Sequence, residues 1–85
     1  MITLQEVSSP GCHICKTFEE WWHRVEKDFA NVNFEKIDVT TPLGQELAGK
    51  HMIFSSPGII INDELFSTGG FNKEAVVKKL KELNG

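Results

Sequence analysis

Two cysteines separated by two residues stand directly before the strongest helical pattern in the chain. Cys12 and Cys15 follow Ser8-Ser9-Pro10-Gly11, a cluster of turn-forming residues. Apolar residues then recur as on one face of an amphipathic helix, at Ile14, Phe18, Trp21, Trp22, Val25 and Phe29. The pattern predicts a helix that begins near His13 and closes at Asn31, with both thiols at its N-terminus.

Cysteine usage limits what this pair can do. These are the only two cysteines in 85 residues, whereas a structural disulfide framework needs several spread along the chain. In a reducing compartment, a close pair indicates either redox chemistry or metal binding.

The composition fits one domain over residues 1–85. The net charge is −3 and no run of Lys or Arg is present, which argues against nucleic acid or an anionic membrane as partner. The longest apolar run, Ile59-Ile60-Ile61, is far shorter than a spanning helix, and no signal peptide is visible at the N-terminus. We therefore expect a cytoplasmic protein, and a monomer.

The rest of the chain predicts the order βαβαββα. The expected strands and helices are a strand to Val7, the helix from His13, a strand over 32–39, a helix opened by Thr41-Pro42, strands at 59–61 and 65–67, and a helix capped by Asn72. Asn62-Asp63 has the composition of a two-residue hairpin turn. A crossover helix makes the first two strands parallel, and the hairpin makes the last two antiparallel.

The apolar residues also predict which helical faces are buried. For the second helix these are Leu43, Leu47 and His51, and for the last helix Ala75, Val76, Leu80 and Leu83. Trp21 and Trp22 are adjacent and point roughly 100° apart on a helix, so we do not expect both to be fully buried.

The position of the two thiols at a helix start predicts their chemistry. Backbone N–H groups and the positive end of the helix dipole favour a thiolate there. Cys12, at the cap, would be the nucleophile that attacks a target disulfide, and Cys15, one turn on, would resolve the mixed disulfide. Residues three apart on a helix lie close enough for a disulfide to close.

The alternative is a metal or iron–sulfur site that uses the same two thiolates. Zinc usually takes four ligands, from two such pairs or from one pair and spaced histidines. No second cysteine pair exists, and His13, His23 and His51 do not stand at ligand spacing. We therefore assign no metal ligand and keep the metal scaffold as the competing hypothesis.

The chain resembles the thioredoxin/glutaredoxin superfamily over nearly its whole length, and in size a small glutaredoxin-like thioredoxin. The matching features are the strand leading into Cys12-His13-Ile14-Cys15, the stretch Lys50–Gly58, the Ile-rich strand, the hairpin with Gly69-Gly70 and the final helix. The resemblance implies an α/β minimal thioredoxin fold, a four-stranded mixed sheet flanked by three helices. It also implies a thiol–disulfide oxidoreductase that needs no cofactor beyond its redox-active disulfide.

The resemblance further implies roles for particular residues. Pro57 would be a cis-proline facing the cysteine pair, and Ser56 would offer its backbone to an extended substrate. Gly69 and Gly70 would belong to the same substrate-binding region. The partners would be protein or low-molecular-weight disulfides and an electron donor, either a reductase or glutathione.

This sequence departs from the family pattern around the cysteines. His13-Ile14 replaces the Pro-Tyr of glutaredoxins and the Gly-Pro of thioredoxins, and Gly11 stands where thioredoxins carry Trp. No lysine closely precedes Cys12, and Phe71-Asn72 replaces the acidic residue that often follows the glycine pair. These departures argue against the use of glutathione, so a glutathione-dependent glutaredoxin is kept as the alternative within enzymes and not as the leading hypothesis.

Three further residues are candidates for the site. Glu6 matches the buried aspartate of thioredoxins and, if buried, would take the proton of Cys15, whereas at a strand end it would be solvated. His13, when protonated, would stabilise the Cys12 thiolate, or else be an exposed spacer. Ile14, with Phe54 and Phe71, would rim an apolar docking surface, although Phe54 and Phe71 also suit the core.

Overall fold

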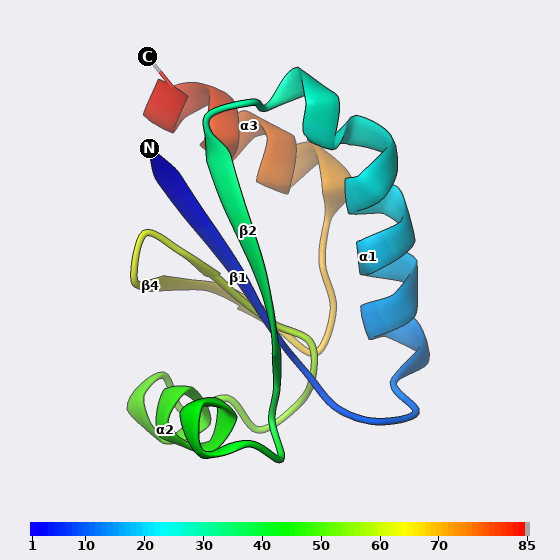
Figure 1. Ribbon diagram of the computed structural model, residues 1–85, viewed down its shortest axis with the longest axis vertical. Coiled ribbons are helices and arrows are strands. Elements are labelled where there is room, and N and C mark those ends of the chain that lie inside the picture. The colour runs from blue at the N-terminus through cyan, green and yellow to red at the C-terminus, as the bar shows by residue number, and fades with distance from the viewer. Residues whose placement is uncertain (85) are drawn as a thin grey trace.

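A computed structural model describes residues 1–84, and Gly85, the last residue of the expected domain, lies outside the described residues (Figure 1). The strands are β1 (Ile2–Ser8), β2 (Val32–Asp38), β3 (Gly58–Ile61) and β4 (Glu64–Thr68). The helices are α1 (His13–Val25), α2 (Pro42–Lys50) and α3 (Lys73–Asn84). This order confirms the predicted βαβαββα succession.

The four strands form one mixed sheet in the order β2-β1-β3-β4. β1 is parallel to β2, whereas β3 is antiparallel to both β1 and β4. The central place of β3 explains why all four of its residues are buried. The predicted α/β class, with a four-stranded mixed sheet and three helices, is therefore confirmed.

The helices cover the two faces of the sheet unequally (Figure 1). α1 and α3 lie over one face, whose core includes Leu4, Phe18, Trp22, Ile59, Val76 and Leu80. α2 lies over the other face with a smaller cluster, formed by Val7, Ile37, Leu47, Ile53 and Ile60. Successive strand residues point to opposite faces, so the Ile run supplies both clusters. Within residues 1–84, no helix is long and apolar enough to cross a bilayer.

Several local predictions are confirmed by hydrogen bonds. Thr41 caps α2, with its Oγ1 accepting from the N–H of Gly44 at 3.1 Å. Asn72 caps α3, with its Oδ1 accepting from the N–H of Ala75 at 3.0 Å. Asn62 and Asp63 both have positive φ, as the tight β3–β4 turn requires.

The first helix is shorter than predicted, and both tryptophans are buried. α1 ends at Val25, and a 3₁₀ turn over Glu26–Asp28 brings Phe29 back under Trp22, with ring centroids 5.9 Å apart. Trp21 is 6% and Trp22 1% exposed, because Phe71, from the loop before α3, covers Trp21. The prediction that the two tryptophans would not both be buried was wrong, because it considered the helix alone and not the loop that covers Trp21.

Three apolar residues expected inside are exposed. Leu43 is 50% and Leu83 39% exposed, and Ala75 is also exposed. Gly44 and Leu47 face the sheet from α2, and neighbouring Leu43 is rotated away from them. Val76 and Leu80 are the residues of α3 that face the sheet, so Ala75 and the terminal Leu83 lie on the exposed side of this helix.

Candidate active site

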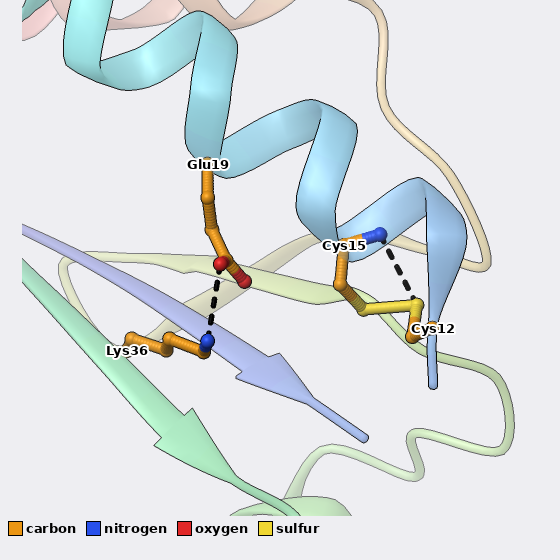
Figure 2. A network of polar contacts seen from close by, with 4 residues as sticks. All are labelled: Cys12, Cys15, Glu19 and Lys36. Atoms are coloured by element: carbon orange, nitrogen blue, oxygen red, sulfur yellow. Dashed lines mark hydrogen bonds and ion pairs between the residues drawn. A yellow bond between two sulfur atoms is a disulfide. The ribbon is translucent and has the colours of Figure 1, made fainter. Parts of the chain in front are cut away.

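The two cysteines form a disulfide at the start of α1 (Figure 2). Cys12 is the N-cap, with extended backbone (φ −75°, ψ 110°), and its Sγ accepts a hydrogen bond of 3.1 Å from the N–H of Cys15. The sulfur therefore occupies the place of the oxygen that usually caps a helix. The Cα atoms are 5.3 Å apart, within the normal range for a disulfide.

The two sulfur-bearing residues differ in exposure. Cys12 is half-buried at the helix end, whereas Cys15 is 2% exposed inside the first turn. An incoming thiol or disulfide therefore reaches Cys12 before Cys15. This asymmetry is what a nucleophile and a resolving thiol require.

The loop between α2 and β3 lies beside the cysteine loop. The Ser56–Pro57 peptide bond is cis, as the resemblance implies, and Pro57 is buried. Ser9, three residues before Cys12, and Ser56 share a hydrogen bond between their hydroxyl oxygens at 2.6 Å. The structure thus joins Ser56, the residue before the cis-proline, to the loop that precedes Cys12.

Gly69 fixes the same loop from the other side. Its N–H lies 3.1 Å from the carbonyl oxygens of both Ser55 and Pro57, and its φ of +75° favours glycine. The half-buried Gly70 accepts a hydrogen bond of 3.1 Å from the hydroxyl of Ser67 at its carbonyl oxygen. Gly69 therefore joins the cis-proline loop directly, and Gly70 supports the turn that positions it.

The remaining candidates differ in how far they are exposed. His13 is exposed, and Ile14 is 44% exposed. Phe54 is 86% exposed, so it does not belong to the core. Phe71 packs edge-on against Phe18, with ring centroids 4.9 Å apart, and contributes to the core rather than to an open surface.

Glu6 is fully buried in β1, on the face of the sheet that α1 covers. Burial is the main cause that raises the pKa of its carboxyl from 4.5 to about 8. The Glu19 carboxyl of α1 acts in the same direction, and the ammonium group of Lys36 opposes both. Of the two environments considered for this residue, the structure shows the buried one.

The sequence interpretation missed Glu19 and Lys36. Lys36 Nζ lies 3.0 Å from Glu19 Oε1, and Figure 2 shows this ion pair next to the disulfide. Both side chains line a surface hollow of about 490 Å³ that also reaches Cys12 and Cys15. The available signal was that Glu19 follows Cys15 by four residues, which places both on one face of a helix.

The structure offers few donors for a metal ion. Within residues 1–84, no three side chains of His, Cys, Asp or Glu come close enough together to hold one. His23 instead pairs with Glu26, with Nδ1 and Oε2 2.7 Å apart.

A comparison of the sequence with known families matches residues 4–82 to the thioredoxin domain. The chain belongs to the thioredoxin-domain family. With a disulfide in its C-x-x-C motif, this thioredoxin-domain protein is a thiol–disulfide oxidoreductase. No curated protein sequence matches the chain.

Solved structures agree on the thioredoxin fold. The oxidised thioredoxin of Plasmodium falciparum is 20% identical with a TM-score of 0.74, and the match covers 99% of this chain and 82% of that one. Mitochondrial thioredoxin 3 of Saccharomyces cerevisiae, in its oxidised form, is 19% identical with a TM-score of 0.75, covering 95% and 77%. A thioredoxin f2 in complex with ferredoxin:thioredoxin reductase is 15% identical with a TM-score of 0.76, covering 99% and 78%.

Proposed function

We propose that this thioredoxin-domain protein is an electron carrier that reduces disulfides in protein or low-molecular-weight partners. Cys12 attacks the target disulfide, and Cys15 then attacks Cys12 Sγ and releases the reduced target. The observation that carries this order is the difference in exposure, since Cys12 is half-buried and Cys15 only 2% exposed.

The surroundings of Cys12 support its role as nucleophile. In the oxidised protein, the N–H of Cys15 already donates to the Cys12 sulfur at 3.1 Å, and a helix N-terminus offers further unpaired N–H groups that would stabilise a thiolate there after reduction. No acidic residue lies in the first turn of α1, so nothing there opposes a thiolate. His13 lies beside Cys12 at the rim of the hollow, and in its protonated form it adds a positive charge.

The cis-proline loop supports a role in holding the target chain. Within residues 1–84, the N–H and C=O of Ser56 form no backbone hydrogen bond. Because an extended target segment can pair with such groups as an added strand does, Ser56 would align it beside Cys12. Pro57 and Gly69 hold the loop in place, while Ile14 and Phe54 offer apolar surface to the target.

Glu6 is suited to take the proton of Cys15. A thiol must lose its proton before it attacks, and Cys15 is only 2% exposed, which favours a base supplied by the protein. A carboxyl with a pKa near 8 is a stronger base than an ordinary glutamate and matches a thiol more closely. Glu6 therefore accepts the proton as Cys15 resolves the mixed disulfide.

A protein reductase is the proposed electron donor. The thioredoxin f2 neighbour was solved with ferredoxin:thioredoxin reductase, which supports a donor of this kind. Lys is absent from the residues directly before Cys12, whereas glutaredoxins often bind the glutathione carboxylate there. Reduction of the oxidised protein by a flavin- or ferredoxin-linked reductase, compared with glutathione, distinguishes the two donors.

The experiment that tests the proposal uses reduction of insulin and of a small aromatic disulfide. Cys12→Ser should abolish turnover of both. Cys15→Ser should accumulate a mixed disulfide on Cys12, visible by mass spectrometry of the intact protein, because the resolving thiol is gone. Full activity of Cys12→Ser, or a mixed disulfide formed on Cys15, would contradict the proposal.

A further inference from the structure

The ion pair between Glu19 and Lys36 lies beside the buried carboxyl of Glu6. Glu6 and Lys36 are paired residues of the parallel strands β1 and β2, so their side chains leave the same face of the sheet. Glu19 reaches this face from α1, where its Oε1 lies 3.0 Å from Lys36 Nζ. Three ionisable side chains from three elements therefore meet on the face of the sheet that α1 covers.

Glu6 has no route of its own to solvent. It is 0% exposed, and within residues 1–84 neither of its carboxyl oxygens has a hydrogen-bond partner. A proton taken up by this carboxyl must be handed on before the next reaction cycle. An unpartnered buried carboxyl with no water contact cannot do this alone.

Glu19 connects this buried group to water. Its side chain is 18% exposed, and it lines the hollow of about 490 Å³ that reaches the disulfide, whereas Glu6 is not among the lining residues. Figure 2 shows Glu19 one turn after Cys15 on the same side of α1, with its carboxylate directed at Lys36. Glu19 thus lines the hollow, and its ion pair with Lys36, the strand neighbour of Glu6, brings its carboxylate close enough to act on the Glu6 carboxyl.

We propose that Glu19 relays the proton that Glu6 takes from Cys15 to the water of this hollow, while Lys36 holds the Glu19 carboxylate in position. The inference rests on the proposed function and deepens it. It assigns a role to a residue that acts through Glu6 and touches neither the sulfur atoms nor the target.

The proton and electron balance of the resolving step is complete. The Cys15 thiol gives its proton to the Glu6 carboxylate, and the Cys15 thiolate attacks Cys12 Sγ. The bond between Cys12 and the target sulfur breaks, and the target thiolate leaves and takes a proton from water. The two protein thiols are oxidised to the disulfide, and the target disulfide is reduced to two thiols. With a pKa of about 8, the Glu6 carboxyl holds a proton near neutral pH. Glu19 therefore takes this proton from Glu6 and releases it into the hollow before Glu6 accepts the proton of Cys15, and the same transfer empties Glu6 again after the resolving step.

The charges around the pair suit a shared proton. Glu19 raises the pKa of Glu6, as expected when two carboxyls compete for one proton near a single cation. Glu19 also raises the pKa of Lys36, so the lysine stays charged during the transfer. The other charged groups near this site are His13 and Lys16 at the rim of the hollow and Asp38 near Lys36 on β2.

The test compares Glu19→Gln with the matched control Glu20→Gln, a neighbouring but exposed glutamate of α1. The reduced proteins react with a disulfide in single-turnover mode, and the rate of the resolving step is followed against pH and imidazole concentration. We expect Glu19→Gln to slow this step about tenfold or more near neutral pH. Added imidazole should restore its rate, because a small base entering the hollow replaces the missing carboxylate. Wild type and Glu20→Gln should be fast and independent of imidazole.

A second measurement needs no turnover. Carboxyl carbon NMR of Glu6 in the oxidised protein should show a pKa lower in Glu19→Gln than in wild type, because the repelling carboxyl is gone and Lys36 remains. An unchanged Glu6 pKa, or an unchanged resolving rate without imidazole dependence, would overturn the relay. If wild type itself reduces no disulfide, the proposed function fails, whatever the NMR titration shows.

Discussion

The hydroxyl oxygens of Ser9 and Ser56 lie 2.6 Å apart, which joins the loop before Cys12 to the loop of the cis-proline. Ser9 also contributes to two hollows, one beside the disulfide and one of about 190 Å³ beside Phe54. This single hydrogen bond therefore lies at the centre of the surface that a target would cover. It connects segments 47 residues apart in the chain.

Ser9→Ala should destabilise the protein by about 1 kcal/mol, since it leaves the half-buried Ser56 hydroxyl without its partner. In a domain of this size, the melting temperature should fall by roughly 4–8 °C. Thermal unfolding of Ser9→Ala, Ser56→Ala and the double variant measures the coupling. The cost of the double variant should be clearly less than the sum of the two, and a strictly additive cost would show that the hydroxyls do not interact.

Glu6→Gln should remove much of the pH dependence of stability. The unfolded chain titrates Glu6 near 4.5 and the folded chain near 8, so the folded state holds an extra proton between these values. The free energy of unfolding therefore falls as pH rises through this window and levels off above it. Glu6→Gln, which stays neutral, should match wild type near pH 4. Above about pH 8 it should be more stable by on the order of 2 kcal/mol, after allowance for screening.

Urea unfolding of the oxidised protein at several pH values measures this effect. Glu20→Gln is the control, because Glu20 is exposed and its removal should leave the pH profile as it is. A Glu6→Gln profile that falls as steeply as that of wild type between these pH values would show that another group titrates.

Local signals in the sequence were sufficient for much of the fold and for the cysteine pair. The caps at Thr41 and Asn72 and the turn at Asn62-Asp63 depend on a few neighbouring residues, and all three were predicted. Cys12 and Cys15 were recognised for the same reason, since their spacing and their place before a helix are local. The position of β3 was predicted from its Ile run, which is likewise local.

Features that depend on packing between distant segments were missed. Trp21 is buried because Phe71, fifty residues later, covers it. The ion pair of Glu19 and Lys36 joins α1 to β2, and neither residue carries a signal for the other along the chain. Glu6 was equally compatible with a buried or a solvated place until the covering helix was known.

Phe54→Ala should weaken the recognition of protein disulfides and leave small disulfides unaffected. Phe54 is 86% exposed beside the cis-proline loop, so its ring is free of the core and available to a bound target chain. Loss of that contact should raise the KM for a protein disulfide roughly tenfold, since burying a large apolar side chain is worth about 1.5–3 kcal/mol. Steady-state kinetics with insulin and with a small disulfide test the difference.

Leu43→Ala is the control for this prediction, because Leu43 is a half-exposed apolar residue of α2. Its KM for both substrates should equal that of wild type, and both variants should be within about 0.5 kcal/mol of wild-type stability. An equal rise in KM for both substrates in Phe54→Ala would contradict a role in binding protein chains.

Two glycines of α2 should respond oppositely to the same substitution. A methyl group on Gly44 would overlap the carbonyl oxygen of Asp38, which already accepts hydrogen bonds from Thr41 N–H at 3.0 Å and Thr41 Oγ1 at 2.6 Å. Because that oxygen belongs to the backbone and is fixed by these bonds, Gly44→Ala should cost about 1–3 kcal/mol. A methyl group on Gly49 meets no atom within 4 Å, so Gly49→Ala should gain up to about 1 kcal/mol from helix propensity.

Urea unfolding of the two variants beside wild type measures both effects in one helix. The close approach of α2 to the end of β2 places Leu47 against Ile37 and Ile60, in the cluster under the cis-proline loop. A displaced α2 in Gly44→Ala should therefore also lower the rate of disulfide reduction, whereas Gly49→Ala should react like wild type. Equal stabilisation by both substitutions would show that α2 does not pack this closely on the β2 terminus, and the position of the cis-proline loop would then need another support.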